Sequence, residues 1–170
     1  IFPENGWSTA GFVANVQLSP RLGFAEGFDL WDYNNMSDGD KQADRALDWL
    51  NEHCTEDAFV FLHMMDPHIF YEAPGSFKDR FTSPFDREGL ADRYNRWDIN
   101  RRMKADRLSD NQKRWIKGRY KGEIAFMDQE ILRLVKALDE LPGDTTIVFH
   151  NDHGEEFWEH QGFEHNHSLY

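Results

Sequence analysis

Residues 58–62 read Ala-Phe-Val-Phe-Leu, and the polar segment His-Met-Met-Asp-Pro-His follows at once at 63–68. A continuous apolar run of this length predicts a strand buried on both faces, as in parallel sheets covered by helices. The abrupt change to polar residues places reactive side chains at the carboxyl end of that strand, where ligands of α/β proteins bind. This stretch therefore predicts both the fold class and the position of a site.

The flanking segments extend the same pattern in both directions. Residues 9–16 predict another strand, and the oxygen-bearing side chains of 37–40 predict a helix start, with an apolar stripe through about residue 53. A long helix is expected over 110–140, stopped by Pro-Gly at 142–143, and a third strand over 145–149. Residues 69–108 have mixed polarity and predict an irregular insert with one short helix. The order predicts an α/β fold, a mostly parallel sheet flanked by helices.

Composition excludes several classes of protein. The chain has 19 Lys+Arg against 31 Asp+Glu, a net charge of −12, which argues against nucleic-acid binding because phosphate backbones require clustered cations. No apolar run approaches the roughly 20 residues that cross a bilayer. Cys54 is the single cysteine, which excludes an internal disulfide and a cysteine zinc site and indicates a small buried thiol.

Six of the eight histidines follow the second and third predicted strands: His63, His68, His153, His160, His165 and His167. Asp152 and His153 are adjacent, and a carboxylate beside an imidazole is a sound ligand pair for a divalent cation. The alternative interpretation is that Asp152 caps a turn and His153 is merely exposed. His160 and His167 stand in no constellation of their own.

His68 follows Pro67, whose ring restricts the backbone and thereby aims the imidazole. An imidazole at this strand end can donate a hydrogen bond or a proton to an anionic substrate oxygen. The alternative is a half-buried histidine satisfied by a loop carbonyl. Four arginines of the insert are either solvated or contacts for an acidic sugar: Arg80, Arg87, Arg93 and Arg96.

Taken together, these segments resemble sulfatases of the alkaline-phosphatase-like superfamily. Residues 143–157 resemble the strand and metal loop of that family, and 159–170 resemble the segment after it. Residues 61–71 match a His-containing segment, and Tyr120, Glu123, Ile124 and Asp128 fit the helix between. Upstream, residues 6–12, Asn15 and 27–29 also match. The matches occur in the family's order and span nearly all of the chain except the insert.

The resemblance implies hydrolysis of a sulfate ester by formylglycine beside bound Ca²⁺, or another divalent cation such as Mn²⁺ or Mg²⁺. It assigns Asp152 and His153 to the metal, and His68 and His165 to catalysis and to sulfate binding, with His68 assisting the leaving oxygen. The substrate it implies is a sulfate-ester small molecule or a sulfated sugar. Residues 1–170 are then part of a single sulfatase-like catalytic domain.

The family's nucleophile lies in a Cys/Ser-x-Pro-x-Arg motif, which this sequence does not contain. Its paired N-terminal aspartates are also absent. We therefore expect the chain to be an internal fragment that is inactive alone, with the formylglycine in a missing N-terminal segment. The alternatives are a phosphonate monoester hydrolase or phosphodiesterase of the same superfamily, and a non-catalytic relative that retains the fold.

Overall fold

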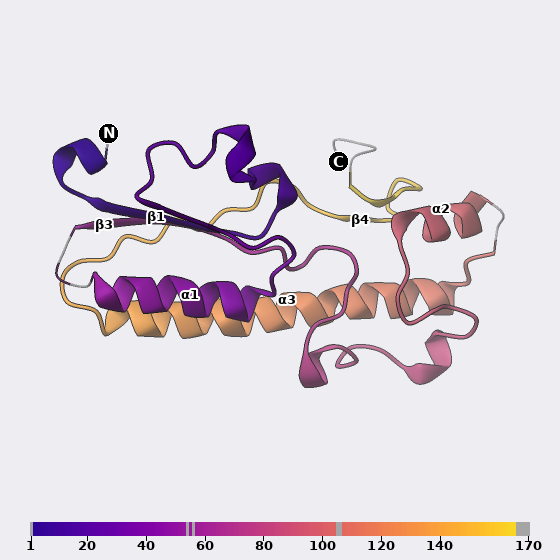
Figure 1. Cartoon of the computed structure of the whole chain (residues 1–170). Helices are drawn as coiled ribbons and strands as arrows, with labels where there is room; N and C mark the ends of the chain where they lie inside the picture. The colour runs from indigo at the N-terminus through magenta and orange to yellow at the C-terminus, as the bar shows by residue number, and fades with distance from the viewer. Residues whose placement is uncertain (1, 54, 56, 105–106, 166–170) are drawn as a thin grey trace. The chain divides into compact units, whose positions relative to one another are not determined.

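Three parallel strands form the sheet in the computed structural model of the chain, which describes residues 2–53, 55, 57–104 and 107–165 (Figure 1). The strand order is β2-β1-β3, where β1 is Ser8–Val13, β2 is Leu30–Tyr33 and β3 is Ala58–His63. β1 is the central strand and is buried along most of its length. The predicted α/β fold class, with a parallel sheet and helices, is thus confirmed.

The chain divides into two compact units. The first comprises residues 1–66 and 127–146, and the second comprises 67–126 and 147–170. Helix α3, Asp110–Asp139, contributes its first part to the second unit and its last part to the first.

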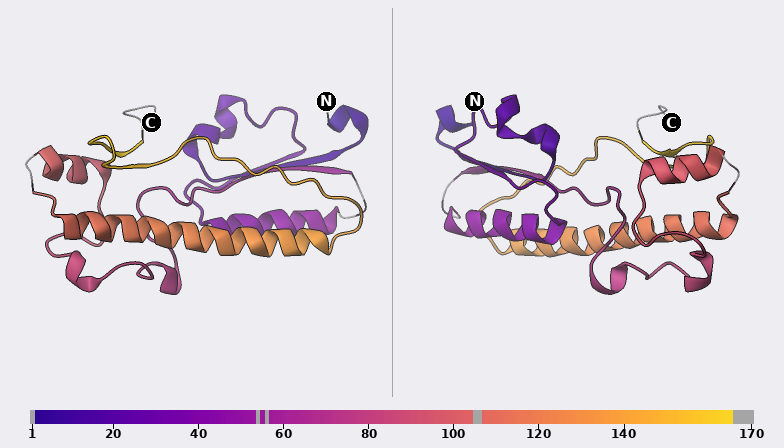
Figure 2. Two further views of the ribbon diagram at one scale, coloured as in Figure 1. Left: turned by 180° about the vertical axis from the view of Figure 1, so that it is seen from behind. Right: turned by 45° about the vertical axis from the view of Figure 1, so that its right-hand side comes forward.

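Helix α1, Gly39–Glu52, packs on the sheet of the first unit. Its buried positions Ala46 and Trp49 form one cluster with Ala10 and Phe12 of β1, as the predicted apolar stripe requires. The first turn takes its backbone partner from a distant residue, because Gly39 N donates to Asp66 Oδ2 at 2.9 Å. The last part of α3 runs alongside α1 in both views of Figure 2.

The core of the second unit lies between the insert, the first part of α3 and a C-terminal hairpin. It is made of buried apolar side chains, namely Ile69, Tyr71, Leu90, Tyr94, Ile99, Leu108, Trp115, Ile116, Phe157 and Phe163. Helix α2, Arg96–Lys104, lies within the insert. Five short 3-10 helices are found among the described residues: Pro3–Asn5, Val16–Leu18, Pro20–Leu22, Gly75–Phe77 and Pro84–Asp86.

Two glycines on one face of α3 allow the insert to approach the helix closely. A Cβ on Gly118 would lie 2.3 Å from the carbonyl oxygen of Phe81, and one on Gly122 would lie 2.4 Å from that of Phe77. Next to them, the fully buried Arg119 donates from Nε to the carbonyl oxygen of Tyr71 at 2.8 Å. The helix thereby fixes the segment that follows His68.

The hairpin consists of β4, Glu156–Phe157, and β5, Phe163–Glu164, which pair antiparallel. Its turn is stabilised by the buried Glu156, whose Oε1 accepts hydrogen bonds from the backbone amides of His160 and Gly162 at 2.8 and 2.7 Å. β5 ends directly before His165, so the hairpin sets the position of that imidazole.

The third predicted strand is wrong as a structural assignment. Residues 144–150 are exposed and form no helix or strand, although Thr145, Thr146, Ile147 and Val148 favour strands. The reason is that a strand exists only where a neighbour completes its hydrogen-bond ladder. β3 was predicted to be buried on both faces. In the structure it is an edge strand of this sheet and is only half-buried.

None of the described helices combines the length with the apolar composition that a bilayer crossing requires. Cys54, which was expected to be a small buried thiol, and His167, one of the histidines after the third predicted strand, lie outside the described residues.

Candidate functional site

Two predicted site residues, His68 and His165, lie side by side in the second unit. Their ring centroids are 5.6 Å apart, and the rings meet edge to face at 60°. His68 comes from the segment after β3 and His165 from the end of the hairpin, 97 positions later in the sequence. The structure therefore brings together the pair that the resemblance assigned to sulfate binding.

The Nδ1 atom of His68 lies 2.6 Å from the carbonyl oxygen of Ile69. A carbonyl can only accept, so Nδ1 carries a proton and donates it in this bond. The interpretation that a loop carbonyl satisfies this histidine is correct for Nδ1. Nε2 is the second nitrogen of the ring, and it is the one available for chemistry with a ligand.

The other histidine is held by a carboxylate. His165 Nδ1 lies 2.5 Å from Oε1 of Glu155, and the hydroxyl of Tyr71 donates to Oε2 of Glu155 at 3.1 Å. Burial, and then the Glu155 charge, raise the pKa of the Tyr71 phenol, so its hydroxyl keeps its proton and acts as a donor.

The predicted metal ligands adjoin this pair. Asp152 Oδ1 and His153 Nε2 are 3.6 Å apart, with side chains 80% and 43% exposed. The rings of His153 and His165 have centroids 4.1 Å apart. The loop thus places both ligand types next to the imidazole pair, and neither residue is buried within the fold.

The chemistry of these two side chains fits a divalent cation. His153 Nδ1 lies 2.9 Å from the carbonyl oxygen of Gly154, which orients Nε2 as metal-binding histidines are oriented by a second hydrogen bond. Donor atoms 3.6 Å apart can share an ion at bond lengths of about 2.0–2.6 Å. Asp152 and His153 supply two of the six or more ligands that Ca²⁺ requires, so other groups must complete the site.

An ion pair fixes the backbone immediately before His165. Glu164 is buried and has a φ of 71°, in the left-handed region that residues other than glycine rarely adopt. Arg96 Nε lies 3.0 Å from Glu164 Oε2, as an ion pair rather than an aligned hydrogen bond, and Arg96 Nη1 donates to the carbonyl oxygen of His165 at 3.1 Å. Burial raises the pKa of Glu164, and the charge of Arg96 opposes that rise.

Replacement of Arg96 by glutamine is expected to destabilise the protein increasingly as the pH rises. The folded-state pKa of Glu164 lies above its unfolded value, so stability falls as the pH rises through the folded pKa; without Arg96 this fall continues to higher pH. The additional loss between pH 4 and pH 7.5 is expected to be about 1–3 kcal/mol, measured by urea unfolding.

Arg93→Gln is the matched control, because its ion pair with Glu72 is largely exposed. We expect a change below about 1 kcal/mol that is similar at both pH values. An Arg96→Gln loss that is equal at pH 4 and pH 7.5 would contradict the assignment of the pH dependence to Glu164.

The insert arginines make contacts within the protein. Arg87 lies 3.4 Å from Asp92, Arg93 covers the ring of Phe70 at 4.3 Å, and Arg80 lies over the Phe77 ring at 5.7 Å. These contacts and the Arg96 ion pair give the insert arginines structural roles, in addition to the solvated and sugar-binding roles expected from the sequence.

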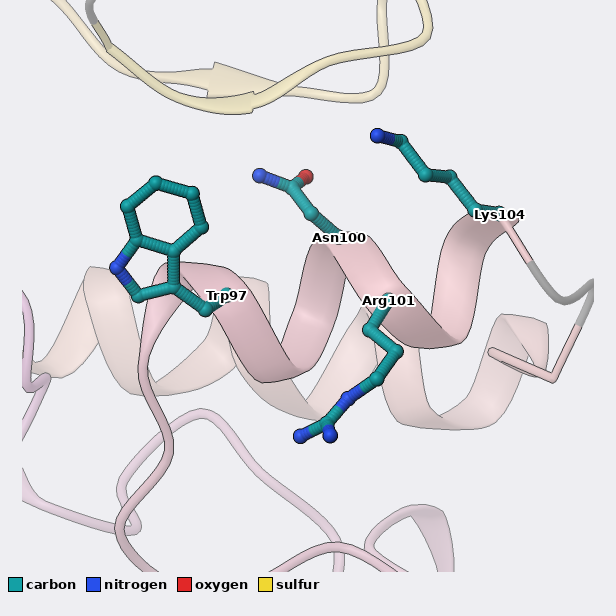
Figure 3. Close-up of a pocket in the computed structure, with 4 residues that line it drawn as sticks. All are labelled: Trp97, Asn100, Arg101 and Lys104. Atoms are coloured by element: carbon teal, nitrogen blue, oxygen red, sulfur yellow. The ribbon is translucent and has the colours of Figure 1, made fainter.

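A separate pocket lies on α2. It is lined by Trp97, Asn100, Arg101 and Lys104, and Figure 3 shows Trp97, Asn100 and Lys104 rising from the same side of the helix. The histidines and carboxylates described above, namely His68, His153, His165, Asp152, Glu155 and Glu164, do not line this pocket.

Sequence reasoning missed Glu155 and Glu164 as contributors to the site, and it considered Arg96 only as a solvated residue or a contact for an acidic sugar. Glu155 stands two residues after His153 in a loop that follows a predicted strand, and this position is a signal that could have identified it. Nothing in the sequence pairs Arg96 with Glu164, since 68 positions separate them. His160, a weaker candidate, is exposed, and its backbone amide stabilises the hairpin turn.

A family model described as Sulfatase matches residues 8–169, almost the whole chain. Among curated proteins, none matches the chain.

Proposed function

This chain belongs to the sulfatase family, and we propose that it carries part of the catalytic site of a sulfuric ester hydrolase. One observation carries the proposal: the ring centroids of His68 and His165 lie 5.6 Å apart, and an oxygen acceptor orients each ring through its Nδ1 atom. Two imidazoles arranged in this way suit an anionic ester with several oxygens.

In this proposal His68 acts as the general acid. In its doubly protonated form, Nε2 gives a proton to the ester oxygen as the bond from sulfur to that oxygen breaks. The ring thereby becomes neutral, and its Nδ1–H still donates to the carbonyl oxygen of Ile69. In its doubly protonated form, His165 donates from Nδ1 to Glu155 and from Nε2 to a sulfate oxygen, and so orients the ester.

The charges around the imidazoles support a cation requirement. Asp152, Glu155 and Glu164 surround the histidines, and Arg96 offsets Glu164. An anionic ester would otherwise meet excess negative charge. A divalent cation on Asp152 and His153 would supply the positive charge that offsets this excess and act as a Lewis acid, and we propose Ca²⁺, Mn²⁺ or Mg²⁺ in this role.

The described residues act by binding the ester and moving one proton. We propose that a formylglycine outside these 170 residues provides the attacking oxygen, because the sequence contains no Cys/Ser-x-Pro-x-Arg motif. We propose a sulfate-ester small molecule or a sulfated sugar as the substrate.

The test compares 4-nitrophenyl sulfate, 4-nitrophenyl phosphate and bis(4-nitrophenyl) phosphate as substrates of the complete gene product, with CaCl₂ or EDTA. We expect the highest kcat/KM for the sulfate ester and a loss of activity in EDTA. Preference for the phosphodiester would indicate the sister hydrolases instead. Absence of turnover, together with no rise in Tm on adding Ca²⁺, Mn²⁺ or Mg²⁺, would indicate a non-catalytic relative, because a ligand of the native state must raise Tm.

A further inference from the structure

Glu155 is placed between two donors inside the second unit. Its side chain is 6% exposed, and that of His165 is 14% exposed. Oε1 faces His165 Nδ1 at 2.5 Å, and Oε2 accepts from the Tyr71 hydroxyl at 3.1 Å. Both carboxylate oxygens are therefore engaged, in bonds that are largely shielded from bulk water.

We propose that Glu155 is a positioning residue for His165: it holds the imidazole by Nδ1 so that Nε2 faces the ligand. The consequence for catalysis rests on the proposed function, whereas the geometric assignment does not. An ionised carboxylate only accepts hydrogen bonds, so the short contact requires a proton on His165 Nδ1. That bond fixes which nitrogen faces Glu155 and limits rotation of the ring.

Tyr71 makes the arrangement rigid. Its side chain is almost fully buried, and its ring meets the rings of Tyr120, Tyr94 and Phe157 at centroid distances of 5.2, 6.3 and 6.1 Å. Its backbone carbonyl accepts from the buried Arg119 of α3. Glu155 is thus supported by a side chain that is itself fixed on a helix, as preorganised sites require.

The competing interpretation is a transition-metal site. His153, Glu155 and His165 offer donor atoms that all lie within 4.8 Å of one another, and two imidazoles with a carboxylate suit Zn²⁺. Such an ion would have to displace the proton of His165 Nδ1, because that nitrogen faces Glu155 Oε1 at hydrogen-bond distance. The two filled hydrogen bonds of Glu155 favour the positioning role.

The test observes the Nδ1 proton directly. In ¹⁵N-labelled protein, we expect ¹H–¹⁵N spectra to show a slowly exchanging Nδ1–H on His165. Glu155→Leu should abolish this signal, since leucine keeps the volume and removes the acceptor. His68 is an internal reference whose Nδ1–H signal should persist, because its acceptor is a backbone carbonyl. Glu88→Leu, at an exposed position of the same unit, should change neither signal.

A double variant keeps the test decisive if Glu155→Leu alone does not fold. Tyr71→Phe with Glu155→Leu replaces both members of the Tyr71–Glu155 hydrogen bond by apolar groups of similar shape, a change that for such a pair is often nearly neutral for stability. We expect it to fold and to lack the His165 Nδ1–H signal. Persistence of that signal in either variant would overturn the proposal. So would its loss from the wild-type protein on adding one equivalent of Zn²⁺.

Kinetics of the complete gene product separate this inference from the proposed function. If the protein hydrolyses sulfate esters, Glu155→Leu should lower kcat about 10–100-fold, the range found when a partner orienting a reactive group is lost. The KM should change less than about threefold, since the sulfate contacts of other groups remain. Failure of the proposed function would appear as inactive wild-type protein with the NMR result intact. An unchanged kcat in an active enzyme that lacks the Nδ1–H signal would overturn the catalytic consequence.

Discussion

Replacement of Gly118 by alanine is expected to lower the free energy of unfolding by about 2–3 kcal/mol, as forcing a methyl group into filled space does. The new Cβ would lie 2.3 Å from the carbonyl oxygen of Phe81, closer than any real contact, and the obstacle is backbone. The insert would have to move away from α3. In an isolated helix the same substitution stabilises by about 1 kcal/mol, so the sign of the effect identifies the contact.

Urea unfolding followed by circular dichroism measures this difference. Lys121→Ala is the control, because Lys121 is an exposed residue of the same part of α3. Its effect should stay within about 0.5 kcal/mol. Gly122→Ala should resemble Gly118→Ala, since its Cβ would meet the carbonyl oxygen of Phe77. A stabilised Gly118→Ala protein would show that the insert does not lie against the helix at this point.

Replacement of His68 by alanine in the complete gene product is expected to reduce kcat/KM for 4-nitrophenyl sulfate by about 10²–10⁴-fold, the range of general acid catalysis. The variant removes the proton donor proposed for the leaving oxygen. An ester with a better leaving group needs less protonation, so the loss should shrink as the leaving-group pKa falls. Rates for a series of substituted aryl sulfates measure that dependence.

His53→Ala controls for the loss of an imidazole away from the site. His53 stacks on Trp49 at the end of α1, in the first unit, with ring centroids 4.1 Å apart. Its kcat/KM should remain within about twofold of the wild type, even if the protein is less stable. A His68→Ala enzyme whose loss is equal for all leaving groups would show that His68 orients the ester without donating a proton.

Local sequence patterns were sufficient for much of the fold. The apolar run at 58–62 predicted β3, and helical spacing predicted α1 and α3 with bounds close to Gly39–Glu52 and Asp110–Asp139. These signals are local because the burial of a strand or helix repeats with its own period. The pairing of His68 with His165 came from the family resemblance, since residues so distant in sequence show no common period.

Features that depend on distant partners could not be predicted in this way. Residues 145–149 have strong strand propensity and yet form no strand, because propensity does not supply a neighbour. β2 was missed because four residues, Leu30–Tyr33, are too short to show an alternating pattern. The contact of Tyr71 with Glu155 spans 84 positions and exists only once the second unit has formed.

The division of the chain has a consequence for its biosynthesis. Neither unit is a continuous stretch: residues 127–146 of the first unit are translated only after the whole insert of the second. A ribosome therefore releases β1, β3 and α1 long before the last part of α3 is available to join them. Folding cannot proceed one unit after the other as it does in chains whose domains follow in sequence. Cutting the gene at codon 66 would separate residues 1–66 from residues 127–146, so the first unit would be incomplete in the first product.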